Sequence, residues 1–291
     1  MQRALVLRRT RSITRRLIVD RAMATLFALA TVIAVAPLVL VVAYIVVNGV
    51  RGIDLDLVTK LPAPVGEAGG GMANAFVGSA ILIAIASAVA LPVGILAGVY
   101  LSEFGRGRFA ATLRFLTDVL TGIPSIVVGI VAYTLVVVPF RSFSALSGGL
   151  ALSIIMIPTV TRTTEEALKR VPTTIREASL ALGVHEWKTV LRIVIPTGLG
   201  GIVTGVMLAI ARISGETAPL LFTAFGSSFW GEGPLKPIAA VPLQIFQYAI
   251  SPYKEWHDQA WAAALVLMLF VLVLNVGIRS VTRTGFQSRG V

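Results

Sequence analysis

Two residues of opposite charge, Arg212 and Glu216, stand inside a long apolar stretch at positions 197–224. An ionisable residue in such a stretch is costly to bury, and by default it marks a transport path or a buried pair. The i, i+4 spacing places both side chains on one helical face. The planar guanidinium of Arg212 has the donor geometry to hold a carboxylate or a tetrahedral oxyanion. Two interpretations follow: an ion pair that locks two helices, or an anion-binding arginine that Glu216 holds in position.

The whole chain, and not only this stretch, is strongly apolar. The chain has 291 residues, of which 56% are hydrophobic and 13% are charged, and its mean hydropathy is +0.88. Soluble domains are about 45–50% apolar and about 25% charged. Because a core of this size cannot hide the surplus, much of it must face lipid. The chain is therefore expected to be an integral membrane protein, which excludes a soluble enzyme, a disordered tail and a secreted disulfide scaffold. It has no cysteine, so disulfides, thiol catalysis and Cys-ligated zinc are excluded as well.

Six stretches are long and apolar enough to cross a membrane as helices, which predicts an all-α membrane protein. The fourth is short and is expected to continue as helix into the polar segment after it. Two glycine pairs, Gly94 with Gly98 and Gly201 with Gly205, have the spacing that lets membrane helices approach closely. The predicted spans are residues 24–47, 74–101, 115–140, 144–160, 197–224 and 260–279.

The distribution of Lys and Arg predicts the orientation. Of the 25 Lys and Arg, seven lie in the N-terminal tail, and three, six and three lie in the second-to-third loop, the fourth-to-fifth loop and the C-terminal tail. The opposite loops hold only five, and the remaining one is Arg212, inside the fifth span. Both termini are thus expected in the cytoplasm, and the net charge of +11 indicates orientation and contact with lipid headgroups rather than nucleic-acid binding. This gives a basic tail at 1–22, a six-helix transmembrane domain at 23–280 and a C-terminal tail at 281–291.

The two long loops on the outer side differ in composition. Residues 48–73 contain prolines and a Gly-Gly-Gly run, which predicts a flexible external connection. Residues 225–259 are rich in proline and aromatic residues. They are interpreted as an interfacial aromatic belt or as a docking surface for an external partner.

The sequence offers no means of catalysis. A G-x-x-x-x-G-K-[ST] phosphate loop is absent, so the chain is not expected to bind ATP in that way. His185 and His257 fall on opposite sides of the membrane and cannot share a metal ion. The chain is thus predicted to be neither an enzyme nor a metal protein.

The polar segment at 161–196 is punctuated rather than featureless. Residues 163–166 have the types that begin a helix, and Pro172 interrupts it. Thr174 and Glu177 have the spacing of a capping box, and Gly183 suits the left-handed position that ends a helix. The segment is expected to form two short helices at the cytoplasmic face, with one apolar stripe each, at Ile175, Ala178 and Leu182 and at Trp187, Leu191 and Val194.

The order Glu-Ala-Ser at 177–179, Gly183 and Ile-Val-Ile-Pro at 193–196 resembles the EAA loop of ABC importer permeases. Ser179 and Ile195 are mild departures from that pattern. The resemblance implies a type I importer bundle whose cytoplasmic coupling helix docks into a groove on a separate ATPase and transmits its closure. The residues it assigns to this coupling are Glu177, Ala178, Ser179, Leu182, Gly183, Trp187 and Pro196.

Four segments narrow the resemblance to phosphate permeases of the PstA type: residues 122–129, 162–168, 176–183 and 214–224. This implies one permease subunit of an ATP-driven phosphate importer in the bacterial inner membrane, forming half of the translocation path. The implied partners are a second related permease, two ATPase subunits and an external phosphate-binding protein. The chain itself is expected to bind no cofactor, since the ATPase uses the ATP.

Within this resemblance, Arg212 would meet the phosphate in transit, and Glu216 would position it and prevent overly tight binding. Arg162 is a second candidate on the exit side, or a simple cytoplasmic anchor. Arg114 and Asp118 are expected to pair at the start of the third span. Three alternatives remain for the whole chain: a permease for another oxyanion or solute, a self-contained carrier or channel, and a membrane scaffold.

Overall fold

A computed structural model describes residues 11–65, 67 and 69–287. The described chain is built of helices, and its only β-bridges are isolated, between Pro62 and Gly70 and between Phe225 and Ile238. Three short segments, η1, η2 and η3, have π-helical hydrogen bonding. The elements are α1 Arg11–Gly52, α2 Leu55–Thr59, α3 Ala73–Val99, η1 Tyr100–Phe104, α4 Gly107–Gly122, α5 Ser125–Ala132, η2 Tyr133–Val137, α6 Val138–Phe140, α7 Ala145–Lys169, α8 Thr173–Ala181, α9 Glu186–Thr189, η3 Val190–Val194, α10 Ile195–Ser214, α11 Ala218–Thr223, α12 Val241–Ala249 and α13 Lys254–Gln287.

The predicted spans are confirmed as helical, with two exceptions in their continuity. Within the part of the chain that the structure describes, five helical stretches are long and apolar enough to cross a membrane, and the pair at 107–122 and 125–140 makes a sixth if it is counted as one span. The third span, predicted at 115–140 as one stretch, is instead formed by these two helices, which meet at a bend of 104°. Pro124 lacks an N–H and disfavours helical geometry in the residue before it, so Ile123 is extended. The fifth span is also interrupted, as described below.

The chain divides into two compact units, residues 1–48 and 49–291. The first holds most of α1, whose apolar side chains are exposed, among them Leu26, Ile33 and Leu40. Since α1 begins at Arg11, the predicted boundary between tail and membrane domain at residue 22 falls inside this helix. The predicted C-terminal tail likewise begins within α13, which ends at Gln287.

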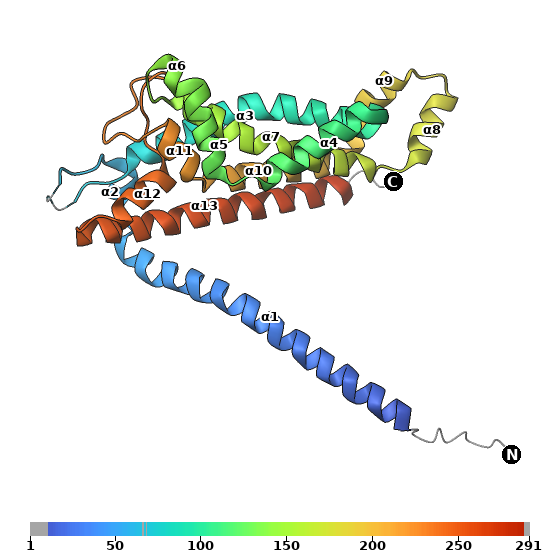
Figure 1. The fold of residues 1–291 in the computed structure, drawn as a ribbon, viewed down its shortest axis with the longest axis horizontal. Helices are drawn as coiled ribbons and strands as arrows, with labels where there is room; N and C mark the ends of the chain where they lie inside the picture. The colour runs from blue at the N-terminus through green and yellow to red at the C-terminus, as the bar shows by residue number, and fades with distance from the viewer. Residues whose placement is uncertain (1–10, 66, 68, 288–291) are drawn as a thin grey trace. The chain divides into compact units, whose positions relative to one another are not determined.

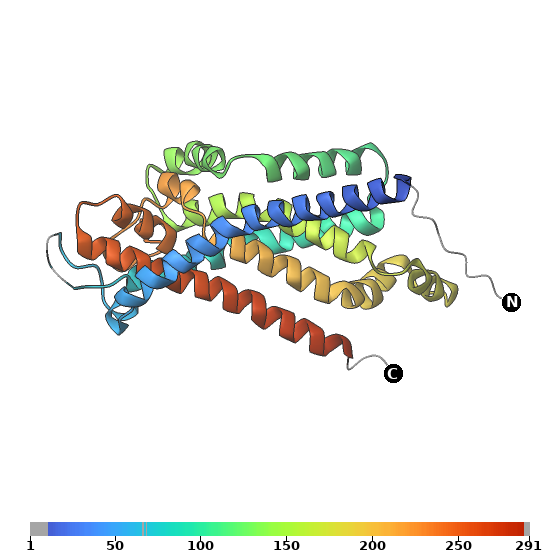
Figure 2. The same ribbon diagram turned by 90° about the horizontal axis from the view of Figure 1, so that it is seen from below.

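In the second unit, α3 and α10 both pack against α7 (Figures 1 and 2), and their glycine pairs face α7. A Cβ atom at Gly94 would lie 2.8 Å from the Cβ of Val160, and one at Gly98 would lie 2.6 Å from that of Thr164. Gly201 and Gly205 contact α7 in the same way, through Ala167 and Thr163. The close approach predicted from the glycine spacing is therefore confirmed.

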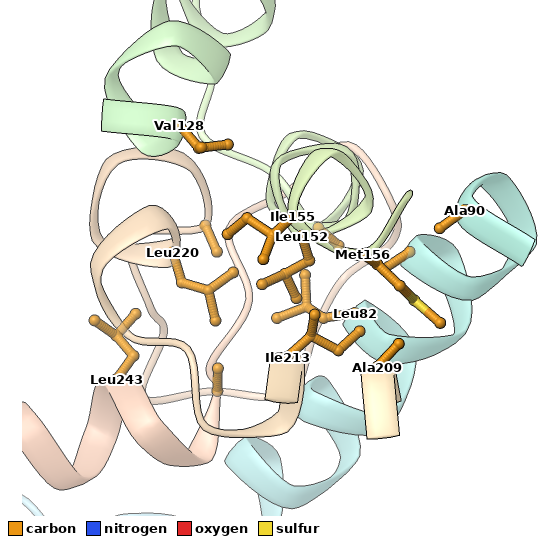
Figure 3. Packing of buried hydrophobic residues seen from close by; sticks show 14 of the residues in the cluster. Leu82, Ala90, Val128, Leu152, Ile155, Met156, Ala209, Ile213, Leu220 and Leu243 are labelled. Atoms are coloured by element: carbon orange, nitrogen blue, oxygen red, sulfur yellow. The ribbon is translucent and has the colours of Figure 1, made fainter. Parts of the chain in front are cut away.

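The largest hydrophobic cluster lies where α3, α7, α10, α11 and α12 meet (Figure 3). Leu82, Met156 and Ile213 are almost completely buried there. Because α7 contributes side chains to the middle of this cluster, it is the central support for the elements around it.

The α8–α9 hairpin, residues 173–189, lies at one end of this bundle, and α2 and α12 lie at the other (Figure 1). The connection at 48–73, predicted as a flexible loop, contains α2 and packs through the buried Leu57 and Met72. We call the two ends the hairpin end and the α12 end.

Candidate functional site

Arg212 lies in the last turn of α10, which ends at Ser214. The single helix predicted for 197–224 is therefore wrong: Gly215 ends α10, and a new short helix begins at Ala218 with a proline in its first turn. Pro219 cannot donate the backbone hydrogen bond that a continuous helix needs. Glu216 sits in the break rather than on a helical face.

The Arg212 guanidinium is held loosely. Its Nε lies 4.0 Å from Oε1 of Glu216, and its Nη1 lies 3.5 Å from Oγ1 of Thr159. Both distances are at the outer limit for an interaction. The Arg212 side chain is 40% exposed and that of Glu216 17%. Since Thr159 is near the middle of α7, Arg212 lies at the mid-depth of the bundle with N–H donors still available.

Arg162, the second candidate, is surrounded by carboxylates. Its Nε lies 3.0 Å from Oε1 of Glu166, and its Nη1 lies 3.9 Å from both Oε2 of Glu165 and Oδ1 of Asp118. Its role in the path stays a prediction, but its charge is already compensated on α7 and α4.

Glu165 is the centre of the most compact charge cluster in the described chain. Its side chain is 1% exposed, and its Oε1 accepts from Nε of Arg114 at 2.7 Å and from Nζ of Lys169 at 2.6 Å. Arg114 also donates to the carbonyl of Leu101. The predicted pairing of Arg114 with Asp118 is thus replaced by a link from α4 to α7. Residues 163–166 do not begin a helix as predicted, because they belong to the last turns of α7.

The α8–α9 hairpin confirms one prediction about the polar segment and corrects another. Gly183 has a φ of +74°, the left-handed conformation predicted for it. The capping box at Thr174 is wrong, since α8 begins at Thr173 and Pro172 occupies the cap position. Of the two predicted apolar stripes, Leu182, Trp187 and Leu191 are exposed, and the buried side chain of α8 is Ser179. Its hydroxyl lies 2.8 Å from that of Thr189 and joins the two helices.

The tip of the hairpin presents apolar side chains to its surroundings. Leu182 is 84% exposed, and Trp187 and Leu191 are both more than half exposed. Glu177 and Ala178 are exposed on the same helix. These residues form a projecting, exposed surface at the tip of the hairpin.

Pro196 does not begin a separate helix. The helix runs from α9 through η3 into α10, and the π-helical turn at Val190–Val194 ends just before the first turn of α10, which contains Pro196. Proline cannot donate a backbone hydrogen bond, and a widened, π-helical turn beside it lets the helix continue. The hairpin is therefore continuous with the helix that carries Arg212.

An ion pair between Arg176 and Glu103 lies beside the hairpin, and the sequence analysis did not predict it. Arg176 of α8 donates from Nε and Nη2 to the two carboxylate oxygens of Glu103, at 2.9 and 2.8 Å. Glu103 is an acidic residue at the end of an apolar span, next to a basic loop. This position in the sequence could have identified Glu103 as a partner for a cytoplasmic arginine.

Similarity to known proteins identifies the kind of chain that carries this geometry. Residues 90–284 match the model of the family described as binding-protein-dependent transport system inner membrane component. The chain belongs to this family. It is 49% identical to a phosphate transport system permease protein PstA of Xylella fastidiosa, over 81% of this chain and 83% of that protein. It is 47% identical to the PstA protein of Yersinia pestis over 79% of each chain.

The fold of this inner membrane component is shared with distant solved transporters. A chain of the MetNI methionine ABC transporter, in an inward-facing conformation, superposes with a TM-score of 0.58 at 20% identity and covers 73% of this chain and 96% of its own length. The predicted importer-permease fold and the resemblance to PstA-type permeases are thus confirmed. As a family member, the chain is a multi-pass component of a transport system rather than a catalytic chain.

At the α12 end, this inner membrane component has a cavity of about 560 Å³ between residues 61–65, 225–229 and α12. Tyr248 stacks on Trp256 with ring centroids 4.5 Å apart, which gives the predicted aromatic segment a packed core. Neither the belt nor the docking interpretation is decided by this packing. Among the described residues, no group of three His, Cys, Asp or Glu side chains is placed to hold a metal ion.

Proposed function

We propose that this chain is a membrane-spanning permease subunit of an ATP-driven inorganic phosphate importer and that it forms half of the translocation path. The observation that carries the proposal is its 49% identity, over 81% of the chain, to a protein named as a phosphate transport permease. The loosely held guanidinium of Arg212 at the mid-depth of the bundle agrees with an anionic substrate.

In this proposal, the α8–α9 hairpin docks on a separate ATPase subunit. The exposed Leu182 and Trp187 supply apolar contact area, and Glu177 supplies a charge beside them. Gly183 allows the sharp turn that makes the tip project. The ATPase binds and hydrolyses the ATP, so this chain needs no cofactor of its own.

The substrate meets Arg212 during transit. Its guanidinium can donate two parallel hydrogen bonds to phosphate oxygens, and the hydroxyl of Thr159 is within reach of the same site. Glu216, 4.0 Å away, orients the arginine and repels the anion, which keeps binding weak enough for release. Arg162, at the hairpin end, would meet phosphate only after leaving its carboxylate partners.

The complete transporter is proposed to contain a second related permease, two ATPase subunits and an external phosphate-binding protein, all at the bacterial inner membrane. Lipid or the second permease would cover the exposed apolar side chains of α1. Both termini would lie in the cytoplasm, with the basic loops and the hairpin.

Uptake by reconstituted complex tests the function. Proteoliposomes holding this chain, its permease partner and the ATPase should accumulate radiolabelled phosphate when ATP is inside and loaded phosphate-binding protein is outside. Excess sulfate should leave the rate unchanged. Uptake of sulfate in place of phosphate would show that another oxyanion is the substrate, and uptake without ATPase would show a self-contained carrier.

Thiol labelling tests the orientation, because the chain has no native cysteine. Val65→Cys and Leu182→Cys both place a thiol at an exposed position, one at each end of the bundle. A membrane-impermeant maleimide should label residue 65 from outside intact cells and residue 182 only after lysis. Labelling of both from the same side would overturn the proposed topology.

A further inference from the structure

Arg176 ties three helical elements together through one guanidinium. Two of its nitrogens hold the carboxylate of Glu103 in η1. The same side chain donates to the carbonyls of Leu168, in α7, and Val171, just after it, at 2.9 and 2.6 Å. A planar fork of five N–H donors is needed for such an arrangement, so lysine could not replace it.

This link is buried and short, unlike a surface ion pair. The side chains of Arg176 and Glu103 are 20% and 6% exposed. The hydroxyl of Ser102 donates to the same carboxylate at 2.7 Å. Breaking the pair would leave a charge buried without a partner, which is strongly unfavourable. The pair therefore holds α8 and η1 at a fixed separation.

The element that receives this link is itself connected to the centre of the bundle. η1 continues α3 in π-helical geometry, and its Leu101 carbonyl also accepts from Arg114 of α4. Gly94 and Gly98 of α3 lie directly against Val160 and Thr164 of α7. Thr159, beside Val160, is the residue that contacts Arg212. An unbroken series of packed and hydrogen-bonded contacts thus runs from α8 to the middle of the bundle.

We infer that Arg176 and Glu103 are positioning residues for transport, which pass movement of the docked hairpin to α3. This inference rests on the proposed function, because it requires an ATPase that moves α8. The second connection, the continuous helix from α9 to α10, leads to Arg212 directly. If the pair of Arg176 and Glu103 were lost, only the continuous helix from α9 to α10 would remain as a connection. Then α8 would move while α3 stayed in place, and ATP would be hydrolysed without opening the path.

A merely structural role for the pair makes a different prediction. If Arg176 only caps the end of α7, its loss would lower stability and the amount of assembled transporter. The number of phosphate ions moved per ATP in each assembled complex would then be unchanged. The ratio of transport to hydrolysis is therefore the deciding quantity.

The test uses Glu103→Gln and Arg176→Gln in the reconstituted complex. Each should keep ATPase activity and keep the crosslink between Leu182→Cys and the ATPase, while phosphate moved per ATP falls about tenfold. Arg170→Gln is the matched control, since Arg170 is an exposed arginine at the end of α7. It should leave the ratio unchanged. An unaltered ratio in both pair variants would overturn the inference.

A thiol bridge gives a second, independent readout. Glu103→Cys with Arg176→Cys should be uncoupled like the single variants, and a bifunctional thiosulfonate reagent that joins the two thiols should restore the ratio. Confirmed bridging without any recovery would contradict a mechanical link. Failure of the Leu182 crosslink in the otherwise native complex would instead refute the proposed function, so the two failures are distinguishable.

Discussion

The charged groups at the hairpin end and those at the mid-depth of the bundle are built in opposite ways. Glu165 is buried and accepts from Arg114 and Lys169 at 2.7 and 2.6 Å. Arg212 is 40% exposed and lies 4.0 Å from Glu216. Both regions place cations beside carboxylates in an apolar chain, but only the first brings them into short contact.

The difference separates two uses of charge in one bundle. A short, buried pair has its hydrogen-bonding capacity spent on the protein, and it fixes the helices that carry it. A loose pair leaves donors free for a passing anion and contributes little to stability. The geometry of the pairs, rather than their presence, indicates which arginines have donors free for a substrate and which hold helices together.

Removal of the Glu165 carboxylate should have the largest effect on stability. Glu165→Ala removes the buried acceptor that Arg114 and Lys169 share, and the loss of these charge-assisted hydrogen bonds should cost about 2–3 kcal/mol. Thermal unfolding of the purified complex in detergent measures the loss. Glu166→Ala is the control, because its pair with Arg162 is half exposed, and it should cost less than about 1 kcal/mol. Equal melting temperatures for the two variants would remove the distinction between the two kinds of pair.

Removing both charges of the loose pair, Arg212 and Glu216, should have the opposite effect: stability is kept and transport is lost. Arg212→Met with Glu216→Gln should assemble with normal stability, whereas phosphate uptake should fall about tenfold to a hundredfold, as expected for loss of a hydrogen bond to a charged group. Uptake per assembled complex is the measurement. Near-normal uptake by this double variant would show that Arg212 is not on the path, and the permease assignment would stand.

Gly183→Val tests the backbone conformation at the tip of the hairpin. A branched residue is strained by about 1–2 kcal/mol in the left-handed conformation, although a Cβ there would meet no neighbour. The hairpin tip should change shape, so that ATP hydrolysis continues while uptake and the residue 182 crosslink both fall several-fold. Gly107→Val is the control, since Gly107 also has positive φ and open space around it but begins α4. Normal uptake in Gly183→Val would indicate that the hairpin is a solvated loop.

The smallest effect is expected from Ser179→Ala, which restores the alanine of the EAA pattern. It removes one hydroxyl from the buried contact with Thr189, and its cost should be about 1 kcal/mol. Ser179→Ala with Thr189→Val should recover most of that loss, because no polar group is then left unpaired. A double-mutant cycle on melting temperature checks this. A fully additive result would show that the two hydroxyls do not depend on each other.

The sequence predicted those features that depend on local backbone chemistry. Gly183 was expected in the left-handed conformation because the helical pattern stops there, and its φ of +74° confirms it. The glycine pairs at 94/98 and 201/205 predicted close helix contacts, which α7 provides. In both cases the residue is glycine, whose lack of a Cβ atom permits a backbone conformation or a close helix contact that other residues do not.

Features that depend on distant contacts were not predictable in the same way. Thr164 and Glu165 look like the polar start of a helix, but in the fold Thr164 is buried against Gly98 of α3, and Glu165 is paired with Arg114. Glu103 and Arg176 are far apart in sequence, so spacing alone could not pair them. The breaks at Pro124 and Gly215 were overlooked because long apolar stretches were interpreted as straight helices.

The exposure of Leu182 has a consequence for how the cell handles this chain. Together with the exposed Trp187 and Leu191, Leu182 forms an apolar surface that favours association until a partner covers it. A subunit made in excess of its partners would display that surface continuously, and quality-control proteases act on such surfaces. The abundance of this protein should therefore follow the supply of the subunit that covers the hairpin, so that synthesis of one component limits the other.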